Sequence, residues 1–182
     1  MKKVFSLLIT AFIAVASFAK PDFTIPQIEK YANADECRKD NDIALKTANF
    51  YLDAELPADI YESRLATKYM IIWISASDEI LLTIDEQRSP YLQCKDKDIS
   101  PQLMAAYFAG CIIYCLENKQ KDHNFDMHYF ALSKMMTYYE KNRSITGSDK
   151  EMDKLLKEFK SSKFKAKEEK KPATKEAKKQ IL

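Results

Sequence analysis

The 182-residue chain is predicted to fold as one all-α domain of about five helices. Turn residues are scarce, with only two glycines, Gly110 and Gly147, whereas a sheet protein with tight turns needs more. Apolar residues recur three and four positions apart through most of the chain, which is the period of a helix with one buried face. Both observations favour helices over strands.

The first residues have the pattern of a secretory signal peptide. Two lysines precede an apolar run from Val4 to Val15, and Ser17 and Ala19 are small residues at the −3 and −1 positions of a cleavage site. The run is shorter than the ~20 residues that a membrane span needs. We therefore expect a signal peptide over residues 1–19 and a periplasmic or secreted bacterial protein that does not span the membrane after cleavage.

The first two expected helices each carry an apolar stripe. The first, over residues 35–53, has its stripe at Ala44, Thr47, Ala48 and Tyr51. The second follows Pro57, which suits the first turn of a helix, and its stripe consists of Tyr61, Leu65, Tyr69, Ile72, Trp73 and Ala76. Residues 78–98 are then expected to form a long connection with a turn at Ser89-Pro90. Connections of this length often carry function or a covalent cross-link.

The third expected helix is apolar on nearly all sides, so it is predicted to be the central buried helix. Ser100 is its expected N-cap, and Pro101 lies in its first turn. Its apolar stretch, Leu103 to Leu116, is shorter than a membrane span. Gly110 lies in the middle and costs about 1 kcal/mol relative to alanine. We therefore expect a neighbouring helix to pack closely against it.

Two further helices and a tail complete the prediction. The fourth helix, over residues 125–142, has a stripe of Phe125, Tyr129, Leu132, Met135, Met136 and Tyr139. The fifth opens with Ser148 and Glu151, spaced as a capping box, and closes a helical domain over residues 20–160. Residues 161–182 are rich in lysine and poor in apolar residues, so a disordered basic tail is expected. Such a tail either keeps the protein soluble or contacts an anionic envelope surface, and export argues against nucleic acid as a partner.

Four cysteines follow the expected cleavage site, and an even number in an exported chain predicts two disulfides. Cys111 and Cys115 lie four apart on one helix, where parallel Cβ directions make a bridge between them difficult. We expect one of them to pair with Cys37 and the other with Cys94, and either assignment is open. The alternative is a soft-metal site, in which Cys111 and Cys115 bind copper with Met104 on the same helical face.

The sequence contains no recognisable catalytic constellation. His123 and His128 are five apart, are expected on opposite sides of a helix, and do not belong to an H-E-x-x-H pattern. Two glycines cannot supply a phosphate-cradling loop. An enzyme would require acids such as Asp85 and Glu86 to meet His128 in a cleft. We therefore expect a protein that is not an enzyme and that holds no cofactor or metal.

A signal peptide, five helices, a "TIDE" loop and an aromatic-rich hairpin resemble small exported helical proteins of Gram-negative bacteria, and this resemblance implies no activity. The size, helical content and paired cysteines are also similar to those of periplasmic immunity proteins that block cell-wall amidases delivered by rival cells. We expect a non-enzymatic binding or protein-interaction protein with an unknown protein partner, or alternatively an immunity-type inhibitor of a cell-wall-degrading toxin. An aromatic groove between the second and fourth helices is the expected contact surface, formed by Tyr69, Trp73, Tyr129 and Tyr139.

Overall fold

The chain is described here from a computed structural model, which covers residues 21–56, 59–82, 84 and 89–171. The predicted signal peptide, residues 1–19, lies outside this part of the chain. The predicted all-α class is confirmed, because the described residues form seven α-helices, one 3-10 helix and a single isolated β-bridge. In chain order the elements are α1 (Ala34–Arg38), α2 (Asn41–Asp53), α3 (Ile60–Ala76), η1 (Pro90–Gln93), α4 (Ile99–Asn118), α5 (Phe125–Thr146), α6 (Lys150–Phe159) and α7 (Phe164–Glu169).

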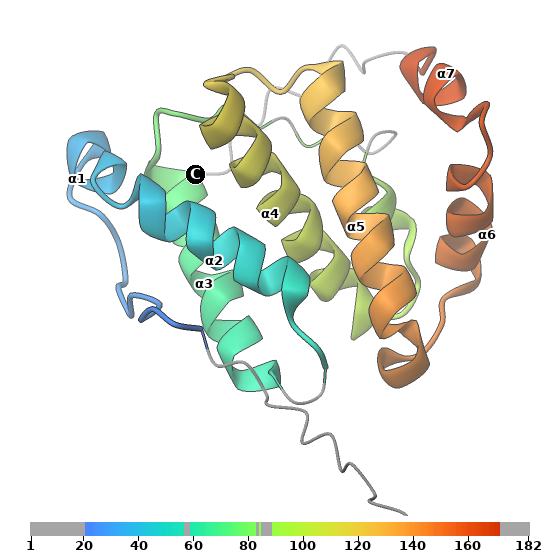
Figure 1. Cartoon of the computed structure of the whole chain (residues 1–182), viewed down its shortest axis with the longest axis horizontal. Coiled ribbons are helices and arrows are strands. Elements are labelled where there is room, and N and C mark those ends of the chain that lie inside the picture. Colours follow the sequence, from blue (N-terminus) through green and yellow to red (C-terminus); the bar gives the residue numbers. More distant parts are fainter. Residues whose placement is uncertain (1–20, 57–58, 83, 85–88, 172–182) are drawn as a thin grey trace, which may run out of the picture.

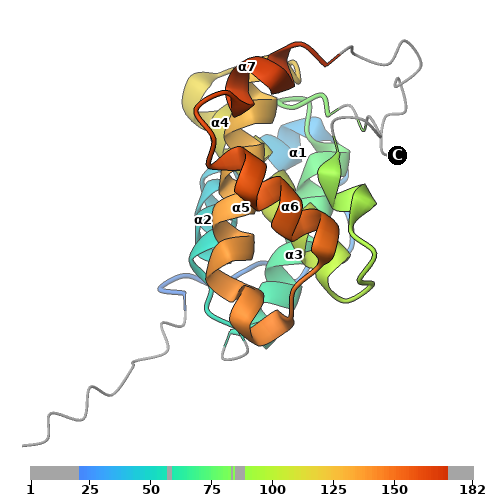
Figure 2. The ribbon, with the colours of Figure 1, turned by 90° about the vertical axis from the view of Figure 1, so that its right-hand side faces the viewer.

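Helix α4 is the central element, as its composition predicts. It packs against α5 along most of its length and against α2 and α3 on its other side (Figure 1). Helices α6 and α7 cover α5 from outside (Figure 2). By length and composition alone, the 20 residues of α4 could cross a membrane. The apolar stretch from Leu103 to Leu116 predicted otherwise, because it alone is shorter than a membrane span. However, 67% of the most apolar window of α4 is buried inside the protein, so packing within a domain accounts for its composition.

The close approach expected at Gly110 is present. A Cβ built at this position would lie 2.6 Å from the Cα of Ala131 on α5, far inside van der Waals contact. Ala131 is itself fully buried. The glycine therefore lets the backbones of α4 and α5 touch, and the neighbouring helix that the sequence predicts is α5.

The helix predicted over residues 35–53 is divided into α1 and α2. Asn33 caps α1 by accepting the backbone N–H of Glu36 at 2.9 Å. Arg38, in the last turn of α1, forms ion pairs with Asp35, Asp78 and Glu79 at 2.7 to 2.9 Å, which link α1 to the end of α3. The predicted stripe of α2 is confirmed, since its four residues are all buried. The stripe of α3 is only partly correct, because its first residue, Tyr61, is 63% exposed.

Asp149, rather than Ser148, caps α6. Its Oδ1 accepts the backbone N–H groups of Glu151 and Met152 at 2.9 and 3.1 Å. Its Oδ2 accepts those of Lys95 and Asp96 at 2.9 and 3.3 Å, which attaches the connection before α4 to α6. Burial alone would raise the pKa of this carboxyl, but the four N–H donors outweigh burial and lower the pKa below its ordinary value of 3.8.

The segment predicted as a disordered tail begins with an ordered helix. Phe164 and Glu168 of α7 are 3% and 2% exposed, and α7 contacts both α5 and α6. The expectation of disorder is therefore wrong for residues 164–169, because one aromatic and one paired acid suffice to attach this short helix. Residues 172–182 lie outside the described part.

Candidate functional site

The candidate site is a hollow of about 460 Å³ near one end of the helical layer. Its walls are the end of α2, the first half of α3, the start of α4 and the middle of α5. Ligand pockets in proteins typically measure about 300–1,000 Å³, so the hollow has room for a small organic molecule.

Helix α3 supplies one wall through residues three and four positions apart. Ile60, Ser63, Arg64 and Thr67 share one face of the helix, and all four line the hollow. The Thr67 hydroxyl donates to the carbonyl of Ser63 at 2.9 Å and is thereby occupied within the helix. The Ser63 hydroxyl, by contrast, forms no hydrogen bond with another described residue.

Two stacked tyrosines form the inner end of the hollow. The rings of Tyr51 on α2 and Tyr138 on α5 are 5.2 Å apart and inclined by 15°. The Tyr51 hydroxyl donates to the carbonyl of Gln102 on α4 at 3.0 Å, so three helices meet here. Burial first, and then the neighbouring Tyr138, raises the pKa of Tyr51 well above its ordinary value. Burial likewise raises the pKa of Tyr138. Both rings are therefore neutral hydrogen-bonding groups.

Two buried hydroxyls that line the hollow lack a hydrogen-bond partner. They belong to Ser63, which is 6% exposed, and Tyr138, which is 2% exposed. The Tyr138 hydroxyl lies close to that of Tyr51 but outside hydrogen-bonding geometry. An unsatisfied buried polar group costs about 1–3 kcal/mol, so a water or ligand that supplies the missing hydrogen bond stabilises the protein.

The presence of two unpartnered hydroxyls among its lining residues distinguishes this hollow from other parts of the described structure. The three remaining unpartnered buried side-chain atoms belong to Asn41, Thr47 and Trp73, and none of these residues lines it. A second hollow of about 430 Å³ lies between Tyr31 and the second half of α3, and none of its lining residues has an unpartnered buried atom. Of these two hollows, the first therefore combines space with residues whose hydroxyls are unsatisfied.

Charged and apolar side chains share the mouth of the hollow. Arg64, Lys97 and Asp98 are exposed members of the lining, and none of them forms an ion pair with another described residue. Leu56 and Ile60 line another part, and Ile60 is 43% exposed although apolar. The lining residues include no histidine or cysteine. The arrangement can therefore enclose an apolar body, form hydrogen bonds and present charge.

The four cysteines that were expected to form disulfides are free and buried. The Cys37 thiol donates to the carbonyl of Trp73 at 3.5 Å, and the Cys115 thiol donates to that of Glu79 at 2.9 Å. Burial is the main cause that raises the pKa of each thiol to about 12. The even number of cysteines and the expected export of the chain predicted disulfides. Instead, the thiols of Cys37 and Cys115 each donate to a different backbone carbonyl.

The thiols of Cys94 and Cys111 are also free and form no disulfide. The Cys94 thiol donates to the carbonyl of Asp96 at 3.6 Å, and Cys111 is completely buried within α4. Burial raises the pKa of Cys94 to about 11 and that of Cys111 further. The predicted two-disulfide framework is therefore wrong for this structure. The copper alternative at Cys111, Cys115 and Met104 stays a prediction, since a bound metal would itself deprotonate the thiols. Among histidine, cysteine, aspartate and glutamate, the described residues contain no group of three potential metal ligands.

The four aromatic residues predicted as a contact surface do not meet in one groove. Tyr69 and Trp73 lie on α3, Tyr129 and Tyr139 lie on α5, and α4 runs between the two helices (Figure 1). Trp73 is fully buried, and the Tyr69 hydroxyl accepts a hydrogen bond from Tyr31 at 3.1 Å. The structure assigns these side chains mainly to packing. The sequence pattern had placed Tyr51 in the core stripe, and nothing in it marked Tyr51 and Tyr138 as partners.

Tyr129 and Tyr139 have separate surroundings on α5. The ring of Tyr129 lies 6.3 and 6.4 Å from those of Phe159 and Phe164. The Tyr139 hydroxyl donates to Asp153 at 2.8 Å and accepts from the backbone of Asp149 at 2.9 Å. Both tyrosines therefore attach the last two helices to α5.

The two histidines converge on one tyrosine rather than pointing to opposite sides. The Tyr107 hydroxyl lies 2.8 Å from Nε2 of His123 and 2.8 Å from Nδ1 of His128. His128 is 1% exposed, and its Nε2 lies 3.3 Å from the Glu168 carboxylate. Burial acts to raise the pKa of Glu168, but hydrogen bonds from His128 and Lys171 lower it overall. This buried chain of polar groups joins α4, α5 and α7.

Comparisons with protein families, with curated proteins and with solved structures found no match for this chain.

Proposed function

We propose that the protein is an exported, non-enzymatic binding protein that holds a small organic molecule in the hollow between α2, α3, α4 and α5. The observation that carries the proposal is that two residues lining the same hollow, Ser63 and Tyr138, carry buried hydroxyls without partners. Both hydroxyls are themselves covered, so a small side-chain rotation opens them to the hollow before a ligand with a polar group can satisfy them. This would recover the free energy that their burial costs.

The stacked tyrosines indicate the shape of the molecule. Tyr51 and Tyr138 offer an aromatic surface, and Leu56 and Ile60 extend the apolar contact toward the mouth. Sites of this kind use an apolar enclosure for affinity and a few polar groups for orientation. The expected ligand has a flat apolar body with hydrogen-bonding capacity at its edge.

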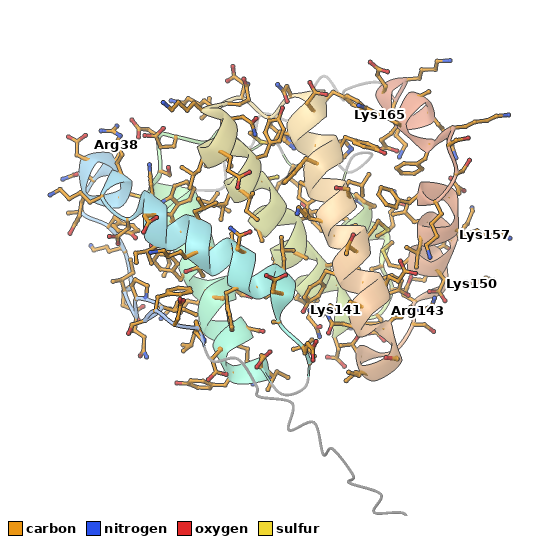
Figure 3. All side chains as sticks on the ribbon, viewed as in Figure 1. Arg38, Lys141, Arg143, Lys150, Lys157 and Lys165 are labelled. Carbon is orange, nitrogen blue, oxygen red and sulfur yellow. The ribbon has the colours of Figure 1, made fainter. Side chains whose placement is uncertain are left out.

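Export remains part of the proposal and is supported by the signal-peptide pattern of residues 1–19. The basic C-terminal region is proposed to contact an anionic envelope surface. Lys150, Lys157 and Lys165 support this, since they lie along α6 and α7 on the side of the molecule opposite Arg38 (Figure 3). The immunity-type alternative has less support, because it needs an exposed surface for a protein partner and most of the aromatic residues suggested as a contact surface are buried.

The test is a nuclear magnetic resonance screen of the folded protein with small aromatic acids and alcohols. Binding in the hollow should shift the backbone amides of Ser63 and Gln102. Ser63→Leu should abolish these shifts, because the larger side chain occupies the space, and Ser144→Leu at an exposed position of α5 is the matched control. If no compound shifts these amides, or if Ser63→Leu binds as well as the native chain, the proposal is wrong.

A further inference from the structure

From the uncompensated charges at the mouth of the hollow, we infer that the ligand is a monoanion, specifically a small aromatic carboxylate. This inference depends on the proposed function, because it assigns a chemical class to the molecule that the hollow holds. It goes further by fixing which end of the ligand faces outward.

The charge at the mouth is unbalanced. Arg64 and Lys97 line it together with one acid, Asp98, so two cations face one carboxylate. Arg64 differs from the other described arginines, since Arg38 and Arg143 each have a carboxylate within 3.0 Å. An arginine at a pocket with no acidic partner can receive a carboxylate from outside, and its planar guanidinium matches that group through two parallel hydrogen bonds.

Helix spacing places this charge relative to the tyrosines. Arg64 follows Ser63 directly and lies one turn after Ile60, so the guanidinium emerges from the wall that also carries the unpartnered hydroxyl. Tyr51 and Tyr138 lie at the inner end. A carboxylate bound by Arg64 and Lys97 therefore holds the charged end of the ligand at the exposed part of the lining and leaves its aromatic body toward the buried tyrosines.

The amino end of α4 adds little to this attraction. A helix end of this polarity favours anions, but the Asp96 carboxylate already accepts the backbone N–H groups of Asp98 and Ile99 at 2.8 and 3.1 Å. The negative charge of Asp96 offsets the partial positive charge at the amino end of α4. Selectivity for an anion must therefore come from Arg64 and Lys97, and this makes it removable by substitution.

The experiment compares matched ligand pairs on the folded full-length protein. In each pair, an aromatic acid such as 2-naphthoate is compared with its alcohol, 2-naphthylmethanol, by calorimetry and by the amide shifts of the hollow. We expect the acids to bind about tenfold more tightly, which corresponds to about 1.4 kcal/mol. Added salt should weaken the acids and leave the alcohols unchanged, because it screens only the charged contact.

Substitutions of the two cations at the mouth test whether they cause the preference for acids. Arg64→Gln and Lys97→Gln should each weaken acid binding more than alcohol binding, so that the roughly tenfold preference for the acid is lost. Lys121→Gln, an exposed lysine away from the hollow, should change neither. If acids and alcohols bind equally at the hollow, the assignment of an anion is wrong but the proposed binding function stands. If neither class binds there, both are wrong.

Discussion

Gly110 and Ala131 bring the backbones of α4 and α5 into direct contact at the centre of the molecule. A methyl group at Gly110 would stand 2.6 Å from the Ala131 Cα and 3.1 Å from its Cβ. These two helices form the most extensive contact between elements in the described structure. The distance between α4 and α5 therefore depends on the absence of a side chain at Gly110.

Gly110→Ala should destabilise the fold, although alanine favours helices by about 1 kcal/mol. The added methyl must push α5 away, because the atom it meets is backbone. Overpacking of this kind costs about 1–3 kcal/mol. We expect a lower midpoint in urea, measured by circular dichroism. Glu117→Ala, at an exposed position of the same helix, controls for helix propensity. A variant as stable as the native chain would contradict the contact.

Asp149→Asn should lower stability at neutral pH by about 1–3 kcal/mol, since the charged cap accepts four N–H groups. Because its folded pKa is lowered, the native carboxylate stabilises the fold fully above its ordinary pKa of 3.8, and this contribution is lost as the pH falls through the folded value. The difference between native and variant chains should therefore shrink below about pH 4. Asp22→Asn, at an exposed position, should show no such trend.

Glu168→Gln should loosen α7 without unfolding the domain. Glu168 is 2% exposed and pairs with His128 at 3.3 Å and Lys171 at 2.8 Å. The loss of charge weakens both contacts, and a charged hydrogen bond contributes about 1.5–3 kcal/mol. Amide hydrogen exchange in α7 should quicken by about tenfold or more, while α4 exchange stays constant. Glu169→Gln, the exposed neighbour, is the control, and equal protection in both variants would refute the anchoring role.

The cysteine thiols should be unreactive in the folded protein and fully reactive after unfolding. All four are buried, and burial raises the pKa of Cys37 and Cys115 to about 12 and that of Cys94 to about 11. Iodoacetamide at pH 8 should leave the native mass unchanged. In denaturant without reductant it should add four groups. Fewer than four, rising to four only after reduction, would show that disulfides form.

The exposed lysines of α6 should promote binding to anionic membranes. Lys150, Lys154 and Lys157 are four and three positions apart on the face opposite the buried Met152 and Leu156, and no described acid forms an ion pair with them. Each lysine near an anionic surface contributes about 1 kcal/mol. Substituting all three by Gln should weaken co-sedimentation with anionic vesicles by about a hundredfold at low salt.

The control for this experiment is a triple glutamine variant at lysines away from α6, namely Lys39, Lys119 and Lys121. It should bind nearly as well as the native chain. Equal losses in both triple variants would attribute binding to net charge, and equal binding to neutral vesicles would exclude a headgroup contact.

Helix periodicity predicted much of the fold. The composition of α4 and its Gly110 identified the central helix and the close neighbour, because local pattern and packing agree there. The break between α1 and α2, a turn at Lys39 and Asp40, was missed because neither residue is a proline or glycine that would mark the end of a helix. Similarly, Asp149 prevailed over Ser148 as a cap because it also binds the backbone of Lys95 in a distant segment.

The candidate site could not be predicted from the sequence. Tyr51 and Tyr138 are far apart in the chain, and each fits an ordinary apolar stripe. Their importance arises only because three helices bring them together beside Ser63, whose unpartnered hydroxyl no pattern can reveal. The histidines were misplaced for a related reason. Their positions depend on Tyr107 and on Glu168, which belonged to a segment expected to be disordered.

The anchoring of α7 draws a distant part of the chain into the interior. Glu168, which follows His128 by 40 residues, extends the buried chain of polar groups that runs through His128 to Tyr107. A chain shortened before Glu168 would keep the bond between Tyr107 and His128 but would leave Nε2 of His128 without its carboxylate. Helix α7 is therefore part of the folded core and marks the shortest C-terminal end at which that core is complete.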